Sequence, residues 1–261
     1  MRLNRSLPPL PPLRGVFITG TDTDVGKTWV AAGLTAVLRH RGVKAVYFKP
    51  VQSGCPRKGG RLIPTDANFA RTLAGMTEPL EVLTPIALRL PLAPGVAAAQ
   101  EGITVDLERI AASLRDLAGR YEFLVVEGAG GLYVPLIGTH FLVLDLIRWL
   151  NLPLAVVAKS GLGTINHTVL TVKAALAADL EVAGVILNRY PDTPGLAEAT
   201  NPGVIEALTG VPILGRLPEV AEPDKPEGRS AFLDNLSEVL EKLLSTPALA
   251  IQESRGSGFS G

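Results

Sequence analysis

The chain has 261 residues, of which 47% are hydrophobic and 19% are charged, an ordinary composition for a globular protein that is long enough to bury one substantial core. Lysine plus arginine and aspartate plus glutamate each number 25, so no positive excess is available to attract nucleic acid or an anionic membrane surface. Cys55 is the single cysteine, which excludes a disulfide within the chain and a cysteine-based metal cluster, and favours the cytoplasm.

The two ends of the chain are predicted to lie outside the folded domain. Residues 1–14 place four prolines among leucines, which interrupts any apolar signal-peptide core and predicts a disordered, Pro-rich leader. Residues 246–261 are rich in serine and glycine, without apolar periodicity, and predict a flexible tail. The most apolar long stretch, Phe141 to Ala158, contains charged residues and a proline, which favours a helix and a buried strand over a membrane span. Residues 15–245 are therefore predicted to form a single domain.

Short runs rich in valine and isoleucine alternate with helical patterns along this domain. Such runs are typical of parallel strands that helices cover on both faces, so the predicted fold class is α/β, with a doubly wound, mostly parallel sheet flanked by helices. The strands are predicted at Gly15–Thr19, Ala45–Lys49, Phe123–Glu127, Leu154–Ala158, Ala183–Asn188 and Ile213–Arg216. The helices are predicted at Lys27–Arg41, Asp66–Ala74, Asp106–Arg120, Thr139–Leu150, Asn166–Ala178, Asn201–Leu208 and Ser230–Ser245.

A glycine-rich loop joins the first predicted strand to the first predicted helix. It runs from Gly20 to Gly26-Lys27-Thr28, where backbone N–H groups and the helix dipole favour a phosphate. Lys27 supplies a full charge, and the Thr28 hydroxyl can face a Mg²⁺ that bridges the β- and γ-phosphates of ATP. Five residues separate the glycines where the strict phosphate-loop pattern has four, so a turn capped by Asp24 is the alternative. The position between strand and helix favours a P-loop NTPase-like domain.

Two further charged residues end buried strands. Lys49 ends the second predicted strand and Glu127 the third, at the edge where open α/β sheets bind ligands. A lysine there normally needs an anionic partner, which an anionic substrate group or a phosphate would provide. The alternative is a lysine that snorkels to solvent or forms a salt bridge. Mg²⁺ in phosphoryl-transfer sites is held by one or two carboxylates and a hydroxyl, which Glu127 and Thr28 provide. Asp66, at a predicted helix start, is either a third ligand or an N-cap.

Polar or flexible segments also follow other strands. Asn188 ends the fifth predicted strand, where its amide suits either the edge of a nucleotide base or a turn. The loop from Gly161 to Asn166 follows the fourth strand and opens a helix, which suits a carboxylate. Residues 85–101 are interrupted by prolines and a glycine, which predicts a connection that leaves the sheet and borders the substrate.

Four motifs together resemble the dethiobiotin synthetase family. They are Thr19-Gly-Thr-Asp-Thr-Asp-Val-Gly-Lys-Thr28, Lys49-Pro-Val-Gln-Ser-Gly54, Val126-Glu-Gly-Ala-Gly-Gly131 and Ile165-Asn-His167, in this order and with compatible spacing. The resemblance runs from about Val16 to about Pro223, and the five-residue spacing of the phosphate loop is itself typical of the family. Each motif alone is weak evidence, whereas the set is specific.

The resemblance implies a ligase of biotin biosynthesis that uses Mg²⁺ and ATP. It implies that 7,8-diaminononanoate (7,8-diaminopelargonate), CO2 and ATP give dethiobiotin, ADP and phosphate. In the family's mechanism one amine captures CO2 as a carbamate, the carbamate takes the γ-phosphoryl group, and the second amine closes the ureido ring. The family is a homodimer in which the loop corresponding to Gly161 to Asn166 of one subunit reaches the substrate carboxylate of the other.

The resemblance also assigns roles to residues of this chain, position by position. Lys49 and Lys27 would be the catalytic cations. Thr23, Ser53, Gly163 and Asn166 would bind the substrate. Thr28, Asp66 and Glu127 would hold Mg²⁺. The nucleotide and its metal would contact Asp24, Val25, Gly26, Lys27, Thr28, Trp29, Asp66, Glu127, Gly128, Ala129, Gly130, Asn188, Arg189, Leu217, Pro218 and Glu219.

Two positions depart from the family pattern, and two other functions stay open. Arg189 stands where the bacterial pattern has an acidic residue, and Pro223 stands where a polar contact to the base is expected, so the base preference is open. A cobalamin-pathway amide ligase is expected to carry a glutaminase domain with a reactive cysteine, for which the segment after Pro223 is too short. A partitioning ATPase that acts as a switch usually has a lysine early in the phosphate loop, where this chain has Thr21 to Thr23.

Overall fold

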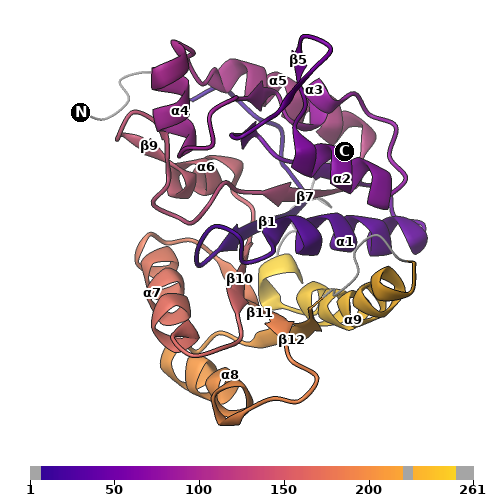
Figure 1. Ribbon diagram of the computed structural model, residues 1–261, viewed down its shortest axis with the longest axis vertical. Coiled ribbons are helices and arrows are strands. Elements are labelled where there is room, and N and C mark those ends of the chain that lie inside the picture. The colour runs from indigo at the N-terminus through magenta and orange to yellow at the C-terminus, as the bar shows by residue number, and fades with distance from the viewer. Residues whose placement is uncertain (1–6, 220–225, 251–261) are drawn as a thin grey trace, which may run out of the picture.

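The fold is built on one parallel sheet of six strands (Figure 1). The computed structural model describes residues 7–219 and 226–250. The sheet order is β12-β11-β10-β1-β7-β2, and every neighbouring pair of strands is parallel. The strands are β1 Gly15–Gly20, β2 Ala45–Phe48, β7 Phe123–Glu127, β10 Leu154–Lys159, β11 Val182–Tyr190 and β12 Ile213–Pro218.

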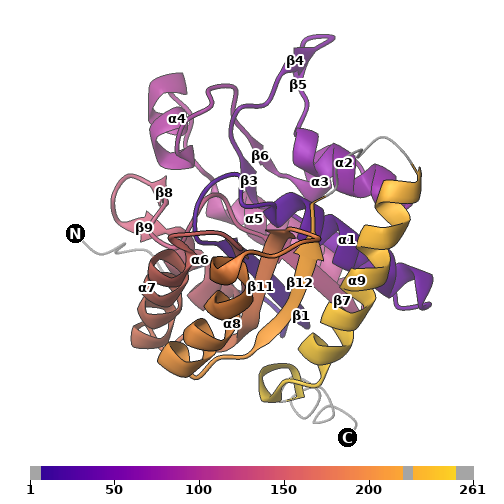
Figure 2. The same ribbon diagram turned by 60° about the horizontal axis from the view of Figure 1, so that its bottom comes forward.

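Helices cover both faces of the sheet, which explains why its strands are continuous apolar runs. Strands β1, β2 and β7 are buried at every residue. Helices α1 and α9 lie on one side of the sheet, and α7 and α8 lie on the other (Figure 2). The helices are α1 Lys27–His40, α2 Thr65–Leu73, α3 Leu80–Leu83, α4 Pro94–Glu101, α5 Leu107–Arg120, α6 Val143–Leu150, α7 Thr164–Ala177, α8 Leu196–Thr209 and α9 Pro226–Leu244.

The order of the strands explains where a ligand can bind. From β1 the chain moves outward to β2, returns to β7 beside β1, and then crosses to β10 on the other side of β1. The winding therefore reverses at β1, and open α/β sheets bind ligands in the crevice beyond the carboxyl ends of the strands at such a point. The loop from Gly20 to Lys27 leaves β1 at this edge, as do the chain segments after β2 and β7.

The predicted fold class is confirmed, and all six predicted strands occur, the third with the predicted bounds and the other five with shifted ends. The helix predicted from residue 139 begins at Val143, because Phe141–Leu142 (β9) pairs with Pro135–Ile137 (β8). The helix predicted from residue 201 begins at Leu196 and contains Pro202. Pro202 has no N–H for the carbonyl of Glu198, and the Tyr190 hydroxyl donates to that oxygen instead (2.8 Å), which lets the helix run through the proline.

Residues 85–101 leave the sheet as predicted, but they contain structure that the sequence pattern did not indicate. Ile86–Ala87 (β6) pairs with Val51–Gln52 (β3), and α4 follows with Pro94 as its first residue. A proline at that position is compatible with a helix because its missing N–H has no intrahelical partner there. A small hairpin, Arg57–Lys58 (β4) and Arg61–Leu62 (β5), projects from the same end of the molecule (Figure 2).

The packed part of the chain extends beyond both expected domain boundaries. The Trp149 indole donates to the carbonyl of Pro8 (2.9 Å), so residues 7–14 of the expected leader lie against the domain. Ala248 and Leu249, in the expected tail, are buried in the core. Residues 1–6 and 251–261 of these two segments, and Pro223, lie outside the described residues. Over the described chain, no helix combines the length and hydropathy needed to cross a membrane.

Candidate active site

The phosphate loop has the backbone geometry of a tight strand-to-helix turn. Gly26 is the N-cap of α1 with φ 99°, a conformation that glycine adopts without strain, and no side chain caps this helix. A Cβ atom at Gly26 would lie 1.9 Å from the Asn188 amide nitrogen, so the position has no room for a side chain. The alternative interpretation, a turn capped by Asp24, is wrong. The first N–H groups of α1 are therefore left for a ligand.

Lys27 lies within this loop and is nearly buried. Its ammonium donates to the carbonyl of Asp22 (2.8 Å), in the same loop. Burial lowers the pKa of Lys27, and the nearby Lys49 lowers it further, while the charges of Glu127, Asp24 and Asp22 oppose that shift. Lys27 and Lys49 line the same cavity, so the two lysines face one region.

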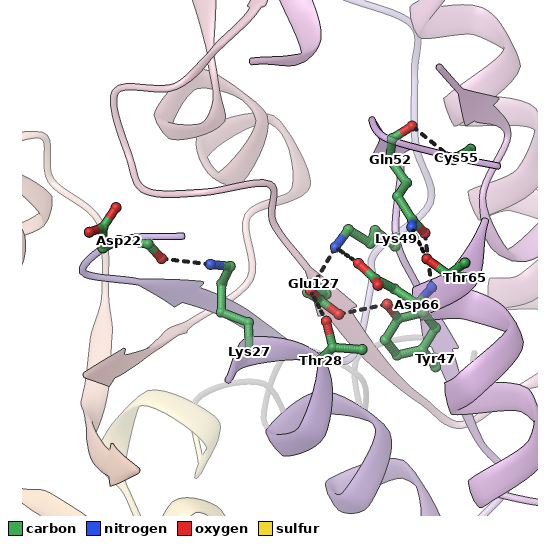
Figure 3. A network of polar contacts seen from close by, with 10 residues as sticks. All are labelled: Asp22, Lys27, Thr28, Tyr47, Lys49, Gln52, Cys55, Thr65, Asp66 and Glu127. Carbon is green, nitrogen blue, oxygen red and sulfur yellow. Dashed lines mark hydrogen bonds and ion pairs between the residues drawn. The ribbon is translucent and has the colours of Figure 1, made fainter. Parts of the chain in front are cut away.

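Lys49, Glu127 and Asp66 meet at the edge of the sheet (Figure 3). The Lys49 ammonium donates to Glu127 Oε1 (2.7 Å) and contacts Asp66 Oδ2. Burial lowers the pKa of Lys49, but the two carboxylates outweigh burial and the net pKa is raised, so the ammonium stays charged. The salt bridge that was the alternative interpretation of Lys49 is therefore present within the chain.

Asp66 reaches this point because α2 begins one residue before it. The N-cap is Pro64, and the Asp66 side chain makes no capping bond, so the N-cap interpretation of Asp66 is wrong. Gln52, for which the sequence predicted no role, bonds to both of the first two residues of the helix. Its amide donates to Thr65 Oγ1 (2.8 Å) and its oxygen accepts from the Asp66 backbone N–H (3.2 Å). Gln52 thereby fixes the start of α2 and the position of the Asp66 carboxylate.

Tyr47 is the second residue of the site for which the sequence predicted no role. It is fully buried, and its hydroxyl donates to Glu127 Oε2 (2.6 Å). Burial raises the pKa of Tyr47 well above its ordinary value, and the charges of Glu127 and Asp66 add to that shift, so the hydroxyl keeps its proton. Strand alternation was a usable signal, because Tyr47 and Lys49 lie two residues apart and such residues share a face.

The oxygen atoms around Glu127 suit a hard divalent cation. Thr28 Oγ1 donates to Glu127 Oε1 (2.8 Å), and Lys49 links that oxygen to Asp66. One hydroxyl and two carboxylates from three elements thus lie close together, with the Lys49 ammonium between the carboxylates. This set fits Mg²⁺, because the ion takes few protein ligands and keeps several waters. Within the described residues there is no group of three or more His, Cys, Asp or Glu side chains arranged to hold a metal. Thr28, Tyr47, Lys49, Asp66 and Glu127 are called the Glu127 cluster below.

The phosphate loop and the Glu127 cluster open into one cavity of about 640 Å³, within the range of roughly 300–1,000 Å³ typical of small-molecule sites. Residues 91–94 form part of its wall, so the connection between β6 and α4 borders the site. Of the predicted site residues, the cavity is lined by Thr23, Asp24, Gly26, Lys27, Thr28, Trp29, Lys49, Ser53, Asp66, Glu127, Ala129, Gly130 and Arg189.

The other predicted site residues do not line this cavity. Val25 is buried inside the loop, and Gly128 packs so tightly that a Cβ would lie 2.8 Å from the Phe17 ring. The Asn188 amide donates to the carbonyl of Val25 (2.9 Å), so it holds the phosphate loop from behind. Gly163 and Asn166 are exposed at the start of α7. Leu217, Pro218 and Glu219 lie on or just after β12, where Glu219 comes within 3.8 Å of the Arg189 guanidinium.

Comparison with known proteins identifies the family of the chain. A family model described as an AAA domain matches residues 14–227. The ATP-dependent dethiobiotin synthetase BioD of Anoxybacillus flavithermus is 40% identical over 208 residues, which cover 80% of this chain and 93% of that protein. The chain belongs to the dethiobiotin synthetase family. The protein of the same name from Bacillus subtilis strain 168 is 43% identical over 213 residues, covering 82% of this chain and 90% of the relative.

Solved structures with the same fold come from more distant proteins. The Aquifex aeolicus MinD cell division protein superposes with a TM-score of 0.54 at 15% identity, covering 88% of this chain and 96% of that one. The Pyrococcus furiosus cell division ATPase MinD gives a TM-score of 0.51 at 18% identity, covering 88% of this chain and 100% of that one. These likenesses establish the P-loop ATPase fold, and they do not separate this family from the partitioning ATPases.

Proposed function

We propose that this chain makes dethiobiotin from 7,8-diaminononanoate, CO2 and Mg-ATP in the cytoplasm. The observation that carries the proposal is that Lys27, from the phosphate loop, and Lys49, directly after β2, line one cavity together with two carboxylates. A carbamate and a γ-phosphate are both anions, so bringing them into contact requires cations between them. The names of relatives about 40% identical over most of the chain support the same assignment.

The proposed reaction has three bond-forming steps. One amine of the diamine adds to the carbon of CO2 and loses a proton, which gives a carbamate. A carbamate oxygen then attacks the γ-phosphorus of ATP while the bond to the bridging oxygen breaks, which gives ADP and a carbamic-phosphoric anhydride. The second amine attacks the carbonyl carbon, and phosphate leaves with the oxygen through which it was attached. Loss of the remaining amine proton completes the ureido ring.

Residues of the site have a role in each of these steps. Lys49 holds the carbamate, and Lys27 with the N–H groups of the phosphate loop holds the phosphates, so that the two reacting groups meet in line. Thr28, Asp66 and Glu127 would hold Mg²⁺, which when bound neutralises charge on the β- and γ-phosphates. Ser53 and Thr23 line the cavity, where they can contact the diamine. Most of the rate enhancement comes from positioning and charge neutralisation.

The proposal extends to a homodimer and to the nucleotide base. Leu162, in the loop before α7, is 97% exposed and Leu170 on α7 is 61% exposed, which suits a surface covered by a second subunit. Gly163 and Asn166 would then complete the substrate site of the partner. The base would lie near Arg189 and the segment from Leu217 to Glu219, where the guanidinium can donate a hydrogen bond to an acceptor atom of the base.

The assay that tests the proposal measures phosphate release with Mg-ATP, bicarbonate and the diamine, and with each omitted in turn. The proposal predicts phosphate and dethiobiotin in equal amounts, and neither without the diamine. Steady ATP hydrolysis that does not depend on the diamine would contradict the proposal and would favour the switch ATPase, whose fold this chain shares.

A further inference from the structure

The two oxygens of the Glu127 carboxylate have different partners. Oε2 accepts only from the Tyr47 hydroxyl among the bonds that the described residues make to it, at 2.6 Å. Oε1 accepts from the Thr28 hydroxyl (2.8 Å) and the Lys49 ammonium (2.7 Å). Tyr47 and Glu127 are 0% and 1% exposed, so water does not compete for these bonds. The carboxylate is therefore held in one orientation.

The register of the sheet explains why Tyr47 reaches Glu127. Tyr47 lies opposite Val125 in the parallel pair of β2 and β7. Residues 125 and 127 share one face of their strand, and side chains opposite one another in register point to the same side of the sheet. Tyr47 therefore points to the side on which the Glu127 carboxylate lies, two residues further along β7. Its ring is anchored in the core, so the hydroxyl has little freedom to move.

We propose that Tyr47 is a positioning residue that holds Glu127 so that Oε1 alone faces the divalent cation shared with Thr28 and Asp66. This inference rests on the proposed function of these three residues as the cation site. Partners that orient a metal-binding side chain contribute to metal affinity although they do not touch the ion. One carboxylate oxygen suits Mg²⁺, which requires octahedral geometry, whereas Ca²⁺ also accepts both oxygens of one carboxylate. Tyr47 should therefore favour Mg²⁺ over Ca²⁺.

Tyr121 provides a matched control. Its hydroxyl also contacts a buried carboxylate, Glu78 Oε1, but at a place remote from the cavity lining. Tyr47→Phe and Tyr121→Phe each remove one hydroxyl from such a pair and leave the ring in place. If Tyr47 has only a packing role, the two variants should differ from the parent in thermal stability alone.

The decisive measurement is Mn²⁺ binding in the presence of ADP, followed by electron paramagnetic resonance, with ADP binding in chelator measured separately. Tyr47→Phe is expected to weaken Mn²⁺ binding about tenfold or more, the usual range for loss of a partner behind a metal ligand. Its metal-free ADP affinity should equal that of the parent, and Ca²⁺ should compete with Mn²⁺ better than in the parent. Tyr121→Phe should match the parent in all three. Parental Mn²⁺ affinity in Tyr47→Phe would overturn the inference.

Glu127→Gln, alone and combined with Tyr47→Phe, provides a second test if Tyr47→Phe alone does not fold. Glu127→Gln removes the charge that Tyr47 orients, so adding Tyr47→Phe to it should leave Mn²⁺ affinity unchanged. A further loss in the double variant would mean that Tyr47 acts by another route. Failure of the parent to bind Mn²⁺ with ADP would reject the cation site and this inference together. A parent that binds Mn²⁺ but does not turn over the diamine would contradict only the proposed reaction.

Discussion

The two sides of β1 differ in how their polar side chains are held at the carboxyl edge of the sheet. Toward β7 and β2, the residues of the Glu127 cluster bond to one another inside the protein. Toward β10, β11 and β12, Gly163 and Asn166 are exposed, and the Asn188 amide bonds to the phosphate loop. Buried charges need partners within the chain, so the first side is defined without a ligand. The role of the polar side chains on the second side depends on which ligand or subunit binds there.

This contrast predicts that the largest effect comes from the first side. Lys49→Ala should reduce dethiobiotin formation about 10²–10³-fold or more, because it removes the cation that meets the carbamate. Binding of Mg-ADP should change far less. Lys159, at the end of β10, is exposed, and Lys159→Ala is the matched control that should keep full activity. Equal turnover by Lys49→Ala and the parent would reject the catalytic role.

Removal of Lys49 is also expected to destabilise the fold, so loss of activity has to be distinguished from loss of folded protein. The variant leaves two carboxylates, Glu127 and Asp66, without the ammonium between them. Breaking a buried pair from one side typically costs about 3–5 kcal/mol of unfolding free energy. Thermal unfolding with and without Mg²⁺ measures this loss, and a folded but inactive variant is the expected result.

Gly26→Ala tests the contact between the phosphate loop and Asn188 on the second side, because Asn188 lies directly against this glycine. We expect a loss of roughly 2–4 kcal/mol in the free energy of unfolding, from strain at φ 99° and from the overlap with the Asn188 amide. Gly42→Ala is the matched control, since Gly42 has φ 82° but open space around it, and strain alone should cost it about 1 kcal/mol. Urea unfolding of both variants measures the difference, and equal losses would refute the close contact.

Asn188→Ala distinguishes two roles for one amide. If Asn188 mainly supports the phosphate loop through Val25, all nucleotides should bind about fivefold more weakly, as expected for roughly 1 kcal/mol from one lost hydrogen bond. If it contacts the base, as the family resemblance implies, the affinity for the nucleotide with one base should fall, while the affinities for the other nucleotides should stay unchanged. Calorimetric titration with ATP, GTP and CTP decides between these outcomes.

The smallest effect is expected at Cys55, which lies near the cavity without lining it. Its thiol is buried, and burial raises its pKa to about 11, so at pH 8 nearly all of it is protonated and unreactive. Cys55→Ala should keep full activity. Alkylation of the folded parent should be slow at pH 8 and should rise as the pH approaches 11. Fast alkylation at pH 8 with loss of activity would contradict a bystander role.

Much of the fold and of the charged half of the site could be predicted from the sequence. The six strands are short apolar runs, and the positions of Lys49 and Glu127 followed from where those runs end. The position of Lys27 followed from the glycine-rich loop before the first helix. The starts of α6 and α8 could not be placed, because they depend on the pairing of β8 with β9 and on the Tyr190 hydroxyl. Both are contacts made in three dimensions.

The roles of Tyr47 and Gln52 were missed for a similar reason. Neither is charged, and each acts by bonding to a residue on another element, which a strand-end pattern does not indicate. On the second side of the site, strand ends indicated Asn188 and the loop from Gly161 to Asn166, while the roles of Arg189 and of the segment from Leu217 to Glu219 were predicted from family resemblance. The side chains of this second side reach a ligand only if the base and the partner subunit occupy the places proposed for them, which a single chain does not determine.

The most direct test of the account follows oxygen from CO2 during a single turnover. With CO2 and bicarbonate labelled with oxygen-18 and with Mg-ATP and the diamine, attack by a carbamate oxygen on the γ-phosphorus should leave one labelled oxygen in the phosphate released. Transfer of that label to phosphate, dependent on the diamine, is the predicted result. Phosphate that takes its new oxygen from water instead would contradict the central claim that Lys49 and Lys27 bring a carbamate and ATP together.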